Sequence, residues 1–521
     1  MRQSKLRKKV VAGPAAAALI CTGALLSSPA TAVAGHAPAT FTADPLATWQ
    51  TDGIVWSLAY ARGVVYAAGS FDTVRPPGAA PGTRQVQRHN FAAFDAATGK
   101  LLPCALSFTS GAGPYTAGTV RAMKPSPDGR VLYVGGSFGH AGSTGVANAV
   151  AVDTADCTLR KDFRPAVNAT VRAIETTDRG VYLGGDFNQV GGQSRNRIAA
   201  FTPGGSLLPF KADIDLPVRA LSAVPARREI LVGGDFKSVN GRPAHALAAL
   251  DITSGATVHT YPGWLPAASV VKSFAQDGSH FYIGAEGTGH RVFDGRISAR
   301  LRDNKMVWKD TCLGATQAVL PYKGVLYSAS HAHDCWGTPG GFPERGLRHT
   351  LLAQSVTDRR ILHWFPDTDG GLGEGVGPRA LTMARGTLWV GGEFTRVNDR
   401  PQQGLTRFGT GTPTSLPQTP ALTLLAAIPG KVTIGWRASW DRTTAALAYR
   451  LYRDGKPVSR QTLSSTPWNL PQMSYTDSVP AGTRHRYAIE VTVTGTRTSH
   501  RSPSLSVTVP ARTGPSPTTG G

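Results

Sequence analysis

One short pattern recurs along most of this chain and constrains the fold more than any other feature. Each copy is a run of aromatic and β-branched residues that ends in two small residues, usually Gly-Gly, followed by a polar residue and commonly Phe. Five copies are clear and two are degenerate; their anchors are Gly69, Gly136, Gly185, Gly234, Ala285, Ser330 and Gly392. The anchors lie 45 to 67 residues apart, which indicates seven similar structural units.

The units share an internal order of strands. A first strand such as Val171-Arg172-Ala173 precedes the strand that ends in Gly-Gly, and a third strand such as 198–201 and a weaker fourth strand with an aromatic residue follow. Four short strands per unit, with regular turns and almost no helical periodicity, are typical of a β-propeller blade. The sequence therefore predicts an all-β protein with a seven-bladed β-propeller over residues 41–410. Residues 41–51 resemble the end of a unit, and we expect them to supply the last outer strand and close the ring.

The repeat also resembles a known family. Gly-Gly-(Asp/Ser/Glu)-Phe with a downstream Arg or Asn and Ala-x-Phe is similar to a bacterial, loosely Kelch-like family of propeller repeats of unknown function. The resemblance covers roughly residues 41–410. It implies the fold and says little about activity.

A second domain follows a linker at residues 411–421. Alternating strands over residues 422–510 are similar to a fibronectin type III β-sandwich. The resemblance implies that Trp436 is the buried core tryptophan and Tyr487 the tyrosine-corner residue, and Asp454-Gly455 predicts a tight hairpin turn. We expect residues 511–521 to form a disordered tail.

The N-terminus has the features of a signal peptide. Five basic residues among the first nine precede an apolar stretch from Val10 to about Leu26, and small residues up to Ala34 suit signal peptidase. We therefore predict that residues 1–34 are removed and that the protein is secreted, extracellular and associated with the cell wall. No later segment is long and apolar enough to span a bilayer.

Net charge indicates the class of partner. Removal of residues 1–34, which carry five basic and no acidic residues, lowers the formal charge from +22 to +17. A basic exported protein should adhere to anionic cell-wall polymers or acidic polysaccharide. No basic block with interleaved aromatics is present, so a specific nucleic-acid partner is not expected. We expect a monomer.

Four cysteines remain after this removal: Cys104, Cys157, Cys312 and Cys335. An even number in an oxidising compartment predicts two disulfides. Proximity favours Cys104 with Cys157 and Cys312 with Cys335, although three pairings exist. The absence of a C-x-x-C spacing disfavours a zinc site.

A correlation of charge links two positions in each unit. Where the residue after the second small residue is acidic, a residue in the preceding strand is Arg or Lys. The pairs are Arg172 with Asp186, Arg219 with Asp235, Lys272 with Glu286 and Arg379 with Glu393. Because charges inside a propeller must be matched, these pairs favour a structural role over a ring of metal-binding acids. Outside them, Asp367, Asp369 and Glu374 form an acidic cluster, either a calcium loop or a turn with solvated carboxylates.

The sixth unit carries the one localised hint of a ligand site. Its loop contains His331, His333, Asp334 and Trp336, and the fifth unit adds His290. Trp336 could stack on a sugar ring and Asp334 could accept its hydroxyls, whereas the two histidines at i and i+2 could bind a divalent transition metal. The alternative is a loop pinned by a disulfide with solvated histidines, and we expect no cofactor.

Motifs for catalysis are missing from the sequence. It contains no G-x-S-x-G, H-E-x-x-H or Walker loop. The leading hypothesis is therefore a secreted, non-catalytic binding or scaffold protein that associates with cell-envelope polymers or polysaccharide. One alternative is a carbohydrate-active enzyme, a glycosidase or lyase, because propellers host such activities. Another is a metal-dependent oxidase related to Kelch-type propellers.

Overall fold

The computed structural model describes residues 38–111, 117–344, 346–493 and 497–512. The predicted signal peptide and most of the predicted tail lie outside these residues. The described part is built from strands, with one 3₁₀ turn at Pro225–Arg227 as its helical element. The prediction of an all-β protein is confirmed. No helix in the described ranges could cross a membrane.

Seven antiparallel sheets, numbered here sheet 1 to sheet 7, follow one another along the described residues from 54 to 408, and five smaller sheets with strands of two or three residues lie among them. Their strands are β2 (Ile54–Ala61), β3 (Val64–Ser70) and β6 (Phe91–Asp95); β8 (Thr119–Pro125), β9 (Val131–Ser137) and β12 (Ala149–Asp153); β13 (Val171–Thr176), β14 (Val181–Gly185) and β17 (Ile198–Phe201); β18 (Val218–Val224), β19 (Glu229–Gly234), β22 (Leu247–Asp251) and β23 (Thr257–Thr260); β24 (Ser269–Gln276), β25 (His280–Gly287), β26 (Arg296–Arg300) and β27 (Met306–Lys309); β28 (Thr316–Tyr322), β29 (Val325–Ala332) and β30 (His349–Ser355); and β31 (Pro378–Ala384), β32 (Thr387–Gly392) and β35 (Leu405–Phe408).

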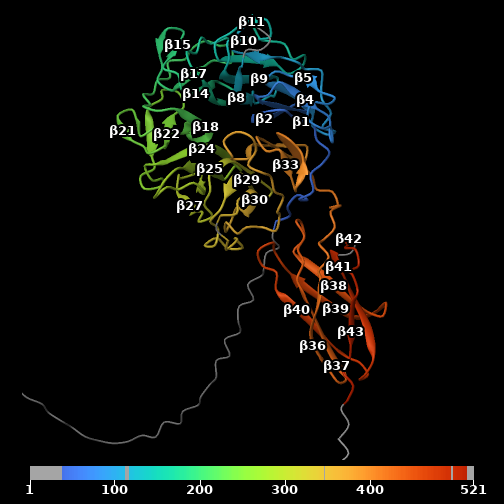
Figure 1. Cartoon of the computed structure of the whole chain (residues 1–521). Helices are drawn as coiled ribbons and strands as arrows, with labels where there is room; N and C mark the ends of the chain where they lie inside the picture. Colours follow the sequence, from blue (N-terminus) through green and yellow to red (C-terminus); the bar gives the residue numbers. More distant parts are fainter. Residues whose placement is uncertain (1–37, 112–116, 345, 494–496, 513–521) are drawn as a thin grey trace, which may run out of the picture. The chain divides into compact units, whose positions relative to one another are not determined.

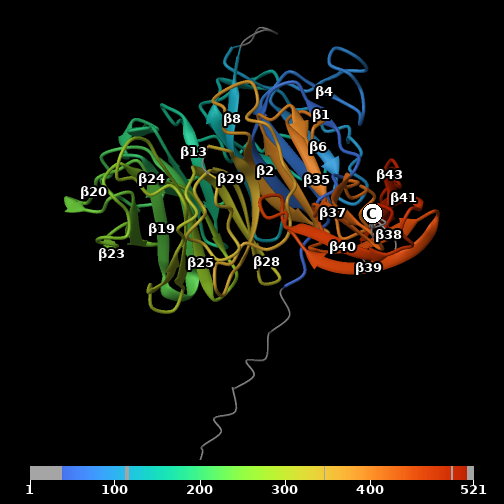
Figure 2. The same ribbon diagram turned by 60° about the horizontal axis from the view of Figure 1, so that its bottom comes forward.

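The sheets surround a common centre in the order of the chain (Figure 1). The first strand of each sheet contacts the first strand of the next, from β2 to β8 and onward to β31. The circle closes because β2 of sheet 1 also contacts β31 and β32 of sheet 7. The blue strand β2 accordingly lies beside the orange strands of sheet 7 (Figure 2). The arrangement is of the propeller type.

The paired glycines have two separate steric roles. A Cβ on the first glycine of a pair would meet the next sheet: at Gly135 it would lie 2.5 Å from Cγ1 of Val171. A Cβ on the second glycine would meet its own first strand: at Gly136 it would lie 2.0 Å from the Thr119 carbonyl oxygen. The pair therefore lets each sheet approach both its neighbour and its own first strand.

Residues near the N-terminus pair with sheet 7. The Thr42 amide donates to the Gly409 carbonyl and the Leu46 amide to the Arg407 carbonyl, both at 2.8 Å, and Pro45 forms a β-bridge with Phe408. The predicted closing segment thus lies along β35, but as one bridge and not as a strand. A proline at its centre removes a donor that a longer ladder would need.

The prediction of four strands in each unit is wrong for most sheets. Only sheets 4 and 5 have a full fourth strand in the described part, β23 and β27. In sheets 1, 2, 3 and 6 the corresponding segment forms a single bridge. In sheets 1 and 3 a proline, Pro103 or Pro209, comes two residues after the bridge residue, whereas β23 and β27 contain none, and proline disrupts a ladder.

Residues 422–508 form two further sheets. One contains β36 (Leu422–Ile428), β37 (Lys431–Arg437) and β40 (Gln472–Ser478), and the other contains β39 (Lys456–Ser464), β38 (Ala446–Arg453), β41 (Arg484–Val493), β42 (Arg497–Thr498) and β43 (Leu505–Thr508). Trp436 and Tyr487 are buried in one core. The Tyr487 hydroxyl donates to the Asp477 carboxylate at 2.9 Å, whereas a tyrosine corner uses a backbone acceptor. Asp454 and Gly455, with φ of 50° and 82°, join β38 to β39.

Candidate functional site

A bulge near the start of the first strand occurs in each of the seven sheets. In each sheet the pairing between first and second strand skips one residue, so that in sheet 3 Val171 pairs with Gly185 and Ala173 with Gly184. The skipped residues are Trp56, Arg121, Arg172, Arg219, Lys272, Gln317 and Arg379. A bulge leaves its extra residue unpaired and re-aims the side chain.

These seven side chains line one cavity of about 120 Å³, and we call them the basic ring. Five of the seven residues are Arg or Lys. The site is therefore small and lined mainly by cations, which suits an anionic group better than a whole sugar or a nucleotide.

Four cations of the basic ring are each paired with a carboxylate from the end of the second strand. The pairs are Arg172 with Asp186, Arg219 with Asp235, Lys272 with Glu286 and Arg379 with Glu393, at 2.5 to 3.1 Å. These are the pairs expected from the charge correlation. Arg379 and Glu393 are nearly fully buried, where a matched charge is required. Burial lowers the pKa of Lys272, although the Glu286 charge opposes this shift.

Arg121 is the exception among these cations. Ser137 occupies the position of its expected counter-ion, and Arg121 forms no ion pair with any described residue. Its guanidinium instead stacks on Trp56, with Cζ 3.8 Å from the ring centroid, and Arg379 approaches the same indole at 4.2 Å. Burial, followed by repulsion from Arg172, lowers the pKa of Arg121 from 12.5 to about 10. Arg121 therefore lacks a negative partner that its neighbours have.

The residues that follow the second small residue of each sheet are called the outer layer; they are Ser70, Ser137, Asp186, Asp235, Glu286, His331 and Glu393. The two uncharged members of the basic ring donate hydrogen bonds to this outer layer. Trp56 Nε1 donates to Ser70 Oγ at 2.9 Å. Gln317 Nε2 donates to the Glu286 carboxylate of the preceding sheet, because its own sheet carries His331 at the acidic position. Arg121 is thus the one cation of the basic ring that forms no ion pair with a described residue.

The structure describes each member of the ligand site predicted in sheets 5 and 6. His331 and His333 lie together, with ring centroids 5.9 Å apart. Asp334 forms a β-bridge with Leu313, and Trp336 is 66% exposed. His290 is exposed, and within the described ranges no hydrogen bond, ion pair or ring contact joins it to the others. The ligand site of these five residues stays a prediction.

His331 belongs to the outer layer around the basic ring. Its Nδ1 is buried without a hydrogen-bond partner. Burial, Arg348 and His333 lower its pKa, so that the neutral imidazole is favoured. The described residues contain no group of three or more His, Cys, Asp or Glu side chains that could hold a metal ion, and the two imidazoles alone do not complete a site.

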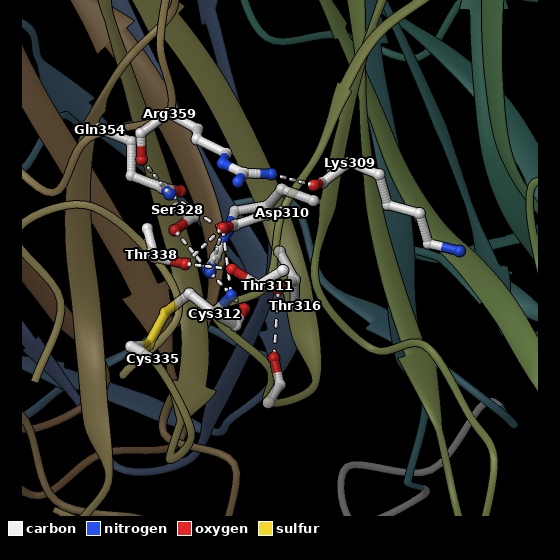
Figure 3. A network of polar contacts seen from close by, with 12 residues as sticks. Lys309, Asp310, Thr311, Cys312, Thr316, Ser328, Cys335, Thr338, Gln354 and Arg359 are labelled. Atoms are coloured by element: carbon white, nitrogen blue, oxygen red, sulfur yellow. Dashed lines mark hydrogen bonds and ion pairs between the residues drawn. A yellow bond between two sulfur atoms is a disulfide. The ribbon is translucent and has the colours of Figure 1, made fainter. Parts of the chain in front are cut away.

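Two disulfides are present, as predicted: Cys104 with Cys157 and Cys312 with Cys335. The second lies beside a buried polar network (Figure 3). Asp310 accepts hydrogen bonds from Gln354 at 2.8 Å and Thr338 at 2.9 Å, and it forms an ion pair with Arg296 in which both side chains are 0% exposed. Because Thr338 follows Cys335 closely, the network and the disulfide together hold the loop of sheet 6.

Sequence reasoning missed this network, although one signal was available. Arg296 pairs with Gly284 on the neighbouring strand, and the residues at the equivalent position of the other sheets are all apolar. These residues are Phe91, Ala149, Ile198, Leu247, Leu351 and Leu405. An arginine in that series predicts a buried acidic partner, but its identity depends on the packing between sheets.

Comparisons with known proteins agree with the repeat. A family model described as a domain of unknown function (DUF5122) beta-propeller matches residues 178–207, which span β14 and β17 of sheet 3. The domain is of the β-propeller type. No curated protein matches the chain.

Two similar solved structures are extracellular domains from B. thetaiotaomicron. The first, from the putative one component system BT4673, has a TM-score of 0.39 and 9% identity, over 89% of this chain and 58% of that one. The second, from the putative hybrid two component system BT3049, has a TM-score of 0.26 and 12% identity, over 88% of this chain and 78% of that one. The match therefore spans little more than half of the first structure.

Proposed function

We propose that this chain is an exported, non-catalytic binding protein, and that its basic ring holds an anionic group of the ligand. In this proposal the seven sheets are the blades of a seven-bladed β-propeller over residues 41–410, and residues 422–510 are a fibronectin type III domain. The closed circle of contacts among the described sheets supports the blade count. The buried Trp436 between two antiparallel sheets supports the second assignment.

One observation carries the functional proposal: Arg121 lines the cavity without a counter-ion. The other four cations of the basic ring are neutralised within the protein, and Arg121 is held in place by Trp56. A half-buried cation beside other cations is costly unless an anion balances it. A phosphate, sulfate or carboxylate group in the cavity would provide that balance through charge-assisted hydrogen bonds.

The ligand class that we propose is an anionic cell-envelope polymer or an acidic polysaccharide. The cavity of about 120 Å³ suits one charged group or chain end, and the remainder of a polymer would lie over the surrounding loops. The net charge of +17 that is left after removal of residues 1–34 would add long-range attraction that weakens with salt. The exposed Trp336 offers a stacking surface for a sugar.

The ion pairs of the carboxylates around the basic ring support a binding function over hydrolysis. A glycosidase needs one carboxylic acid that donates a proton and one carboxylate that acts as nucleophile or base. Asp186, Asp235, Glu286 and Glu393 each form an ion pair with a cation of the basic ring. The acids around the basic ring therefore fit the role of counter-ions.

The test compares two arginine variants of the mature chain, residues 35–521. Arg121→Ala removes the unpaired cation, and Arg130→Ala removes an arginine that is 75% exposed in the turn between β8 and β9. Both lower the net charge by one. Binding of labelled polygalacturonate and of dextran sulfate is measured by fluorescence anisotropy at low and moderate salt, with neutral dextran as the control ligand.

We expect Arg121→Ala to weaken binding about 10-fold or more, because a hydrogen bond to a charged group contributes ~1.5–3 kcal/mol. Arg130→Ala should change it less than about twofold. Equal effects of the two variants would show that only the overall surface charge matters. Equal binding of neutral dextran would also reject the proposal.

A further inference from the structure

A glycine-rich loop precedes sheet 7 and surrounds the carboxylate of Glu393. The Glu374 and Val376 amides donate to that carboxylate at 2.7 and 2.8 Å. A Cβ at Gly373 would lie 2.3 Å from Glu393 Oε2, so only glycine allows this approach. The backbone of the loop is therefore held by a buried anion that is itself paired with Arg379.

The side chain of Glu374 differs from the other carboxylates that contact the basic ring. It accepts from Arg379 Nη2 at 2.9 Å, and its carboxyl group is 67% exposed. The same Nη2 also donates to Glu393 at 2.8 Å, whose side chain is 0% exposed. Arg379 thus has a permanent buried counter-ion, and Glu374 is a second, solvated one.

Glu374 also acts on the cation that lacks a partner. Its negative charge opposes the fall in the pKa of Arg121, which burial and the neighbouring arginines cause. Arg121 and Arg379 lie on either side of Trp56, with Cζ 3.8 and 4.2 Å from the indole centroid. The Glu374 carboxylate, bound to Arg379 at 2.9 Å, is therefore placed to compete with an external anion for that arginine.

We propose that Glu374 is an internal carboxylate that competes with the anionic group of the ligand for Arg379 and Arg121. This inference rests on the proposed function of the basic ring. Displacing the Glu374 side chain from Arg379 costs little, because a solvated ion pair contributes only ~0–1 kcal/mol. Arg379 also keeps Glu393 as its buried counter-ion. The backbone of the loop does not have to move, since its anchor is Glu393 and not the Glu374 side chain.

The test uses inorganic sulfate, whose charge is constant over the neutral pH range, and isothermal titration calorimetry of the mature chain. Glu374→Gln keeps the size and the backbone amide but removes the charge. Asp399→Asn is the matched control, because it removes a carboxyl group that is 91% exposed in the same part of the chain. Because the ion pair to be displaced is solvated, we expect Glu374→Gln to bind sulfate about two- to fivefold more tightly than the wild type.

The outcomes separate this inference from the proposed function. We expect tighter binding in Glu374→Gln, no change in Asp399→Asn, and loss of the gain in Glu374→Gln/Arg121→Ala. If Glu374→Gln binds sulfate as the wild type does while Arg121→Ala abolishes binding, the basic ring is the site but Glu374 does not compete. If neither the wild type nor Glu374→Gln binds sulfate or the acidic polymers, the proposed function itself is wrong.

Discussion

Closure of the circle of sheets can be tested at a single contact between sheet 7 and sheet 1. A Cβ added at Gly391 would lie 2.5 Å from Cγ1 and 3.0 Å from Cβ of Val55, and 3.4 Å from Cδ1 of Leu58. Both partners are on β2, so the two sheets would have to separate by roughly 1 Å to restore ordinary contacts. Overpacking of this kind costs about 1–3 kcal/mol.

The equivalent contact inside the circle sets the expected size of the effect. A Cβ at Gly184 of sheet 3 would lie 2.5 Å from Val218 of sheet 4. We therefore expect Gly391→Ala and Gly184→Ala to lower the free energy of unfolding by similar amounts. At roughly 2.1 cal/mol/K per residue over about 370 residues, a loss of 1–3 kcal/mol lowers Tm by about 1–4 °C.

Equilibrium urea unfolding, followed by tryptophan fluorescence and circular dichroism, gives the free energies. Gly145→Ala is the control, because no atom lies within 4 Å of its Cβ position. In a double-mutant cycle, Val55→Ala should make room and reduce the cost of Gly391→Ala by at least 0.5 kcal/mol. A cost of Gly391→Ala no larger than that of Gly145→Ala, or strict additivity with Val55→Ala, would refute the contact between first and last sheets.

Two further variants test the surroundings of the sheet 6 loop. Arg296→Met should lower the free energy of unfolding by about 3–5 kcal/mol because it leaves Asp310 buried without its cation, and Arg296→Met/Asp310→Leu should recover most of the loss in the same urea assay. Because burial lowers the pKa of His331 from 6.5, the unfolded chain binds a proton more readily than the folded chain below about pH 6.5, and stability falls as the pH decreases. His331→Gln should reduce the pH dependence of the free energy of unfolding between pH 6.5 and 5.5. An unchanged pH dependence would show that His331 is not its source.

Much of the fold could be predicted because each strand carries its own local signal. Aromatic and β-branched runs that end in Gly-Gly recur at a regular spacing, and the structure confirms an all-β chain of the propeller type. The two disulfides followed from the even number of cysteines. The count of seven blades stays a prediction that the contact between Gly391 and Val55 makes testable.

The candidate site was only partly accessible from the sequence. The pairing of Arg172 with Asp186 and its counterparts could be read from charge correlation within one chain. The role of Arg121 was visible only as an exception to that correlation. The ligand site predicted from His290, His331, His333, Asp334 and Trp336 stays a prediction, because which loop side chains share a face depends on how the loops of adjacent units fold in space.

The amino-acid order by itself determined the repeating strands, the even number of cysteines and the matched charges, because these depend on neighbours within one unit or on composition. Only the tertiary structure decided that seven residues, one from each sheet, face a single cavity. The reason is geometric: a β-bulge at Arg121 or Trp56 re-aims a side chain by an amount that depends on pairing with the next strand. A cavity shared by sheets far apart in sequence exists only when the circle of contacts is complete.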